Sequence, residues 1–309
     1  MNTDTILLPE DVKEIIYKEC RALQFIARSY ADQRIAGAYK SLHKGSGIEF
    51  EEARLYSPGD DARRIDWKIS ARKQQPYIKS FREEKETSLI LVTDVSTSTH
   101  SGRTDSKLRK SVEVSAFLSS IAIFNQDTVG AIPFSHDYRT FIPPAKGIPA
   151  TFRAMQGILT EAEKVRQEGF IKTPSSLVPC LLSTERLLRR KSIIFIISDF
   201  NFDVDFEKPL AALQKYHDVY AIRIKDSIEK EIPEKGIFAI RNPETGADYL
   251  INLSSPFERS KIIKQIEDHS EDLIQTFSRA RVNYLELTEQ DDMRSSLFSF
   301  FHERRARRA

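Results

Sequence analysis

From residue 87 onward, short apolar runs alternate with longer segments in which apolar residues recur every three or four positions. An unbroken apolar run is typical of a strand buried on both faces, and the wider spacing is typical of a helix with one buried face. The pattern predicts strands at 88–93, 128–134, 192–198, 218–224 and 282–287, and helices at 105–124, 149–166, 177–190, 208–216 and 256–280. This alternation predicts an α/β fold, a doubly wound and mostly parallel sheet with helices on both faces.

The remaining segments depart from this alternation. Residues 139–142 can pair with 128–134 as a short hairpin, and residues 233–253 predict a second hairpin at the sheet edge. Upstream, apolar spacing predicts an N-terminal helix at 9–36, and the turn sequence Ser57-Pro58-Gly59-Asp60 indicates a small β-rich arm. We divide the chain into an N-terminal helical segment (1–45), the arm (46–86), the α/β domain (87–290), and a C-terminal helix with a basic tail (291–309).

Composition narrows the class of protein. The 309 residues are 40% hydrophobic and 30% charged, and the formal net charge of +2 gives no general attraction to nucleic acid or anionic lipid. Cys20 and Cys180 form neither a disulfide framework nor a metal-binding spacing. The sequence shows no signal peptide and no apolar run near the roughly 20 residues that a spanning helix needs. We therefore expect a cytoplasmic protein without a membrane span, for which nucleic acid is an unlikely partner.

Oxygen-bearing side chains follow two of the predicted strands. Asp94, Ser96 and Ser98 come directly after the run 88–93, and Asp199 follows 192–198. Ligands bind at the carboxyl ends of strands in open α/β sheets, and an oxygen-only donor set suits a hard cation such as Mg²⁺. The alternative is that Asp94 and the serines only cap a following helix.

The order of these residues resembles the metal-ion-dependent adhesion site of von Willebrand factor A domains, which combines D-x-S-x-S, a threonine on a second loop and an aspartate on a third. The resemblance implies Mg²⁺ or Mn²⁺ held directly by Ser96 and Ser98, with Asp94 and Asp199 acting mainly through bound waters. The threonine position falls at Ser175, although Thr173 is close enough to compete, and Pro174 replaces the glycine usual in that family.

The arm carries a second resemblance. Glu49-Phe50, Pro58-Gly59-Asp60-Asp61 and Arg64-Ile65-Asp66-Trp67 closely resemble motifs of the bacterial domain-of-unknown-function family 58, and the likeness extends from about residue 42 to 287. That family has an A-domain-like fold and often accompanies MoxR-type AAA+ ATPases. Membership implies such an ATPase, or one of its clients, as the partner.

The acids and arginines of the arm admit two interpretations. Asp60, Asp61 and Asp66 could form a second metal site, but the interleaved arginines favour an ion-pair and turn network. We expect this network to lock the arm to the sheet with Trp67 as an apolar anchor, so that Asp66→Ala costs about 3 kcal/mol.

Three functions are compatible with these patterns. The leading one is a non-enzymatic binding module, in which an open coordination position on Mg²⁺ accepts a carboxylate of the partner. A metal-assisted hydrolase needs a general base near the metal, and His100 is the candidate. The third is a structural scaffold with a degenerate metal site. The sequence contains no phosphate-binding glycine motif, no nucleophile elbow and no paired histidines, so we expect no enzyme activity. Because the site should lie on the rim of the sheet, we expect Asp94→Ala to have little effect on folding.

Overall fold

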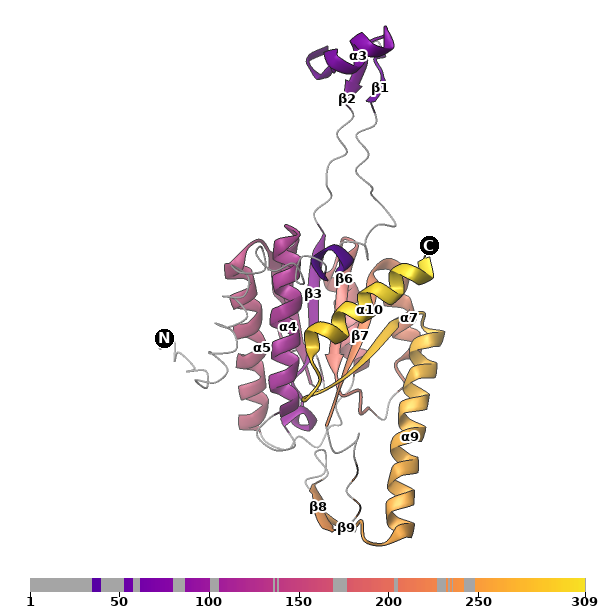
Figure 1. Cartoon of the computed structure of the whole chain (residues 1–309). Helices are drawn as coiled ribbons and strands as arrows, with labels where there is room; N and C mark the ends of the chain where they lie inside the picture. Colours follow the sequence, from indigo (N-terminus) through magenta and orange to yellow (C-terminus); the bar gives the residue numbers. More distant parts are fainter. Residues whose placement is uncertain are drawn as a thin grey trace, which may run out of the picture.

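The computed structural model describes most of the α/β domain and parts of the segments before it (Figure 1). The described residues are 35–39, 53–57, 62–79, 87–100, 106–135, 137, 139–168, 177–202, 205–226, 232, 234, 236–241 and 248–308. Residues 35–39 are helical, and the rest of the predicted N-terminal helix at 9–36 lies outside the described residues.

The centre of the molecule is a six-stranded sheet in the order β10-β7-β6-β3-β4-β5. All neighbouring strands are parallel except β4 and β5, which are antiparallel. The strands are β3 (Ser88–Asp94), β4 (Thr128–Phe134), β5 (Ile142–Ala145), β6 (Ser192–Ser198), β7 (Asp218–Lys225) and β10 (Asn283–Thr288). The structure thus confirms the predicted α/β class with a mostly parallel sheet, and the short hairpin, whose second strand lies at 142–145 rather than 139–142.

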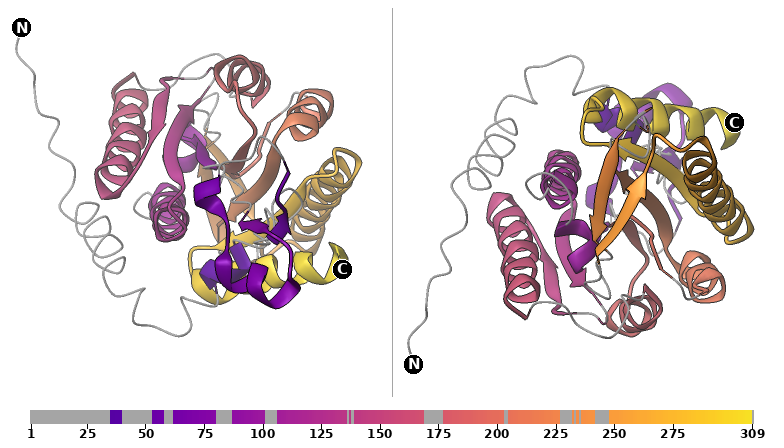
Figure 2. Two further views of the ribbon diagram at one scale, coloured as in Figure 1. Left: turned by 90° about the horizontal axis from the view of Figure 1, so that it is seen from above. Right: turned by 90° about the horizontal axis from the view of Figure 1, so that it is seen from below.

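Helices cover both faces of this sheet (Figure 2). One face packs against the helical residues 35–39 and against α4 (Ser106–Phe124), α5 (Ile148–Glu168) and α10 (Met293–Arg308). The other packs against α6 (Leu177–Leu187), α7 (Glu207–Tyr216) and α9 (Pro256–Arg279). The predicted helices are confirmed, with ends that differ by a few residues.

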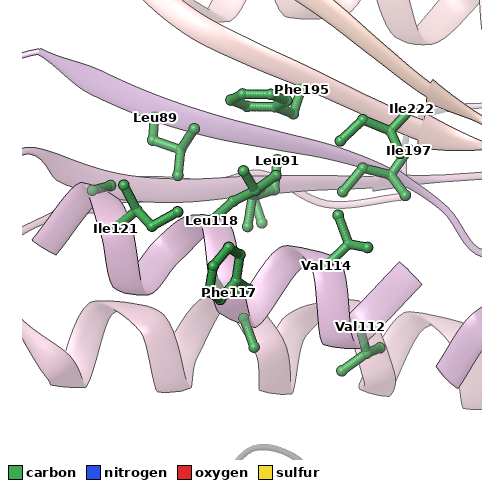
Figure 3. Close-up of a cluster of buried hydrophobic side chains, with 14 of the residues drawn as sticks. Leu89, Leu91, Val112, Val114, Phe117, Leu118, Ile121, Phe195, Ile197 and Ile222 are labelled. Carbon is green, nitrogen blue, oxygen red and sulfur yellow. The ribbon is translucent and has the colours of Figure 1, made fainter. Parts of the chain in front are cut away.

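Alternation along β3 explains why its central residues are all apolar. Leu89 and Leu91 enter the core beneath α4, whereas Ile90 and Val92 enter the core on the opposite face. Figure 3 shows the first of these cores, where side chains of β3, β6 and β7 meet those of α4. Because successive side chains of a strand point to opposite faces, the middle of a strand covered on both sides is apolar at every position.

The second predicted hairpin is present but is not an edge of the main sheet. Strands β8 (Ile237–Arg241) and β9 (Asp248–Asn252) pair with each other as a separate antiparallel sheet. Figure 1 places this hairpin beside the start of α9, at the end of the molecule toward which β3 and β6 run.

The arm contains a helix that the apolar pattern did not predict. Strands β1 (Ala53–Leu55) and β2 (Tyr77–Lys79) are antiparallel, and between them lie η1 (Ala62–Arg64) and α3 (Trp67–Lys73). Asp66 is the N-cap of α3, since its Oδ1 accepts hydrogen bonds from the backbone N–H groups of Lys68 at 2.9 Å and Ile69 at 3.1 Å.

The proposed role of Trp67 as an anchor was wrong. Its side chain is 73% exposed, and Figure 1 shows the arm standing beyond the main sheet rather than packed on it. Asp60 and Asp61 lie outside the described residues. The structure gives Asp66 a capping role within the arm.

Loss of this cap has a predictable cost. We expect Asp66→Ala to lower the free energy of unfolding by about 1 kcal/mol, the usual cost of an N-cap, rather than the 3 kcal/mol expected from a buried ion pair. The measurement is the urea midpoint of the purified chain. Asp66→Asn keeps the capping oxygen and serves as the control, which should remain near wild type. A larger loss with both variants would restore the buried ion pair.

A close backbone approach between β4 and β5 gives a second test of the fold. A Cβ added at Gly130 would lie 2.7 Å from the carbonyl oxygen of Ile142 and 2.8 Å from the backbone nitrogen of Pro144. We expect Gly130→Ala to cost about 1–3 kcal/mol in urea unfolding, because strand backbone must move. Gly37→Ala is the matched control: nothing lies within 4 Å of its added Cβ, and alanine favours a helix by up to about 1 kcal/mol. Equal midpoints for the two variants would contradict the observed approach.

Candidate functional site

The sheet brings together the two carboxylates at the strand ends. Strands β3 and β6 are parallel neighbours, with Thr93 opposite Ile197. Asp94 is the last residue of β3, and Asp199 follows the last residue of β6. Both side chains are buried, with exposed fractions of 0% and 5%. Both residues lie at the strand ends, as expected, but because they are buried we now expect a substitution at Asp94 to affect stability as well as any ligand.

Asp94 is held by hydrogen bonds from both strands. Its Oδ1 accepts from the backbone N–H of Ser96 at 2.9 Å, and its Oδ2 accepts from the hydroxyl of Ser198 at 2.6 Å. Burial and, to a smaller extent, the neighbouring Asp199 raise the pKa of Asp94 to about 7, although the hydrogen bonds from Ser198 and Ser96 act to lower it.

The loop after β3 orients the two serine hydroxyls toward each other. The Oγ atoms of Ser96 and Ser98 are 2.9 Å apart. The backbone N–H of Val95 donates to Phe134 of β4 at 2.8 Å, and the hydroxyl of Thr99 donates to the carbonyl oxygen of Ser96 at 2.7 Å. The loop is thus tied to β4 at its start and then turns into the short helix η2 (Thr97–His100).

The loop after β6 is a sharp turn with a strained residue. Phe200 has φ of 54°, in the left-handed region, which costs a residue with a Cβ roughly 1–2 kcal/mol. Its N–H donates to Ser198 Oγ at 2.9 Å, and its buried ring lies 5.0 Å from that of Phe277, edge to face. These contacts hold the turn that directs the Asp199 side chain back toward Asp94.

Two cations hold Asp199 from different elements. The Nζ of Lys107, in the first turn of α4, is 3.2 Å from Asp199 Oδ2. The Nε of Arg223, on β7, donates to the backbone carbonyl of Asp199 at 3.2 Å. The Nη1 of Arg223 donates hydrogen bonds to Ser270 Oγ at 2.9 Å and to Glu286 Oε1 at 3.2 Å. The position of Asp199 is therefore coupled to α4, β7, β10 and α9.

The donor set is compatible with a hard divalent cation. Adjacent ligands in an Mg²⁺ octahedron with bonds of 2.0–2.1 Å lie about 3 Å apart, close to the 2.9 Å between the two serine hydroxyls. In the described part of the chain, no three His, Cys, Asp or Glu side chains gather to hold a metal. A cation here would therefore depend on the hydroxyls of Ser96 and Ser98 together with the two carboxylates and water.

Some predicted site residues are not placed. Ser175 and the competing Thr173 lie outside the described residues, as does the side chain of His100. Sequence reasoning missed Ser198, Lys107 and Arg223. A signal existed for Ser198, because aligning the ends of two neighbouring parallel strands puts it beside Asp94. Lys107 is unusual as a cation in the first helical turn, but nothing in the sequence indicates its contact with Asp199, 92 positions away.

Comparison with known proteins identifies the family. The sequence pattern described as "Protein of unknown function DUF58" matches residues 52–272, more than half of the chain, and this protein belongs to that family. Uncharacterized proteins of Mycobacterium tuberculosis and Mycobacterium bovis are each 26% identical over 286 residues, which cover 92% of this chain and 88% of theirs.

Solved structures give more distant likenesses. The conserved hypothetical protein BatB from Bacteroides thetaiotaomicron has a TM-score of 0.44 at 15% identity and covers 72% of this chain and 99% of its own. An aerotolerance-related membrane protein from Bacteroides fragilis has a TM-score of 0.42 at 12% identity and covers 70% of this chain and 98% of its own. In this chain, none of the helices that the structure describes is long and apolar enough to cross a membrane.

The buried carboxyl of Asp94 predicts a pH dependence. Its native pKa of about 7 lies above the unfolded value near 3.8, so the native state keeps a proton that the unfolded chain releases between these values. The stabilisation is complete below about pH 4 and is lost as the pH rises toward 7. In chelator, wild type should therefore lose about 2–3 kcal/mol relative to Asp94→Asn between pH 5 and pH 8. Urea unfolding across this range measures the difference, and parallel curves for the two proteins would contradict a raised pKa.

Proposed function

We propose that this protein is a non-enzymatic binding module of the von Willebrand factor A type. A Mg²⁺ or Mn²⁺ ion held at the strand ends would bind a carboxylate of a protein partner. The observation that carries the proposal is the convergence of Asp94, Ser96, Ser98 and Asp199 at the ends of two neighbouring strands. Ser175 or Thr173 would complete the donor set. An ion with few protein ligands keeps exchangeable waters, and one of these can be replaced by an Asp or Glu of the partner.

The charges around Asp199 favour binding over hydrolysis. A metal-assisted hydrolase needs a base that takes a proton from the attacking water. Lys107 and Arg223, the two charged side chains that hold Asp199, are cations and cannot act as general bases while charged. Asp94 already accepts hydrogen bonds from the backbone N–H of Ser96 and from the hydroxyl of Ser198 on β6. These contacts support a site that holds a ligand rather than one that turns it over.

Apolar side chains at the same end of the molecule support a protein partner. Leu250 on β9 and Phe257 in the first turn of α9 are 77% and 78% exposed. Figure 1 shows these elements at the end toward which β3 and β6 run. Exposed apolar side chains near a polar centre are typical of protein interfaces. We propose a MoxR-type AAA+ ATPase, or its client, as this partner, with both proteins in the cytoplasm.

Metal binding tests the centre directly. Calorimetric titration of the purified chain with Mn²⁺ should show weak binding. Ser96→Ala should lower the Mn²⁺ affinity tenfold or more, because one hydroxyl ligand is lost. Ser119→Ala is the matched control: its buried hydroxyl donates to Ser115 within α4, so its removal should leave Mn²⁺ affinity unchanged. Equal binding by wild type and Ser96→Ala would remove the serine from the site, and undetectable binding would exclude the metal-dependent function.

The partner is tested separately. A MoxR-type ATPase from the same cell should bind immobilised protein in Mg²⁺, and binding should fall tenfold or more in chelator and with Ser96→Ala, but not with Ser119→Ala. Binding that persists in chelator would show that the interface does not depend on the metal.

A further inference from the structure

Lys107 occupies an unusual position for a cation. It is the second residue of α4, where the helix dipole favours negative charge, and it is only 9% exposed. Burying an ammonium group requires a compensating partner. Here its Nζ reaches Asp199 Oδ2 at 3.2 Å, across 92 positions of sequence. Two unfavourable features, burial and the helix N-terminus, are therefore combined at one side chain that contacts the candidate site.

A buried lysine one turn later in α4 does not share this role. Lys110 is 6% exposed, and its Nζ donates to the carbonyl oxygen of Asp291 at 2.9 Å and pairs with Glu113 at 3.2 Å. Lys110 thus ties α4 to the loop before α10. Its similar burial and different contacts make it a matched reference for Lys107.

The ion pair changes the charge that the site offers to a metal. Asp94 and Asp199 together bring two negative charges when both are ionised, and the ammonium of Lys107 cancels one of them. The same ammonium contacts Oδ2, one of the two oxygens through which Asp199 would engage a metal-bound water. The other, Oδ1, accepts a hydrogen bond from the N–H of Asn201 at 3.3 Å.

We infer that Lys107 is a resident cation that competes with the divalent metal for Asp199 and so sets the metal concentration at which the site loads. Without metal, the ammonium neutralises the buried carboxylate and keeps the strand ends folded. With metal, the second positive charge beside the ion weakens its binding, and the ammonium must leave Oδ2 for the site to load fully. The inference rests on the proposed metal site and specifies how that site is regulated.

Removal of the charge tests the competition. Lys107→Met keeps most of the side-chain volume but not the ammonium, and should bind Mn²⁺ at least tenfold more tightly than wild type in calorimetry at pH 7.5. Lys110→Met should bind within twofold of wild type. In chelator, Lys107→Met should unfold at a lower temperature, and saturating Mn²⁺ should raise its melting temperature by more than that of wild type. Asp199→Asn should abolish the difference that Lys107→Met makes.

The outcomes separate this inference from the proposed function. Equal Mn²⁺ affinity for wild type and Lys107→Met overturns the competition but leaves the metal site intact. No Mn²⁺ binding by either protein overturns both, and makes Lys107 a permanent counter-ion. Lys107→Met that folds only with Mn²⁺ supports the inference. If it folds under neither condition, Lys107→Gln, which retains a neutral hydrogen-bond donor, replaces it in the same titration and is judged by the same affinities.

Discussion

Two carboxylates that lie side by side in a region closed to water impose the central constraint on this structure. Asp94 and Asp199 are both buried, and burial together with the neighbouring Asp199 raises the pKa of Asp94. A protein can relieve such a pair by holding a proton, by donating hydrogen bonds, or by supplying a cation. The proton is held by Asp94, whose pKa is raised to about 7. The hydroxyl of Ser198 donates the hydrogen bond, and Lys107 supplies the cation. The local structure around the strand ends follows from these three responses.

The architecture explains why the constraint arises at this place. Strands β3 and β6 are covered by helices on both faces, so their central residues are all apolar. Their parallel register then brings Asp94, at the end of β3, and Asp199, just after the end of β6, to the same edge. The left-handed Phe200 turns the chain there, and its ring is held in the core with Phe277. Packing on one face of the sheet therefore supports the strained turn that directs Asp199 toward Asp94.

Sequence reasoning succeeded where the physics is local. The apolar runs at 88–93 and 192–198 predicted strands because burial on both faces leaves a continuous signal. It failed for α3, since seven residues are too few to establish a helical period, and Trp67 was taken for an anchor because its size suggested burial. Lys107 was missed because its contact joins positions 92 apart in sequence, and no apolar pattern encodes a tertiary ion pair. The strand ends were predictable, whereas the choice of counter-ion depended on the packing of α4.

The same ion pair relates two of the functional hypotheses to each other. A scaffold needs the carboxylates neutralised permanently, and a metal-dependent binding module needs them available to a cation. Lys107 satisfies Asp199 in the first state, and under the competition inferred above a divalent ion that displaces its ammonium would produce the second. Because Lys107 reaches Asp199 from the first turn of α4, a change of cation at the strand ends also changes a contact of that helix. Under that proposal, scaffold and binding module would be two charge states of one site, and the affinity of Asp199 for the ammonium relative to the metal would determine which state the protein adopts.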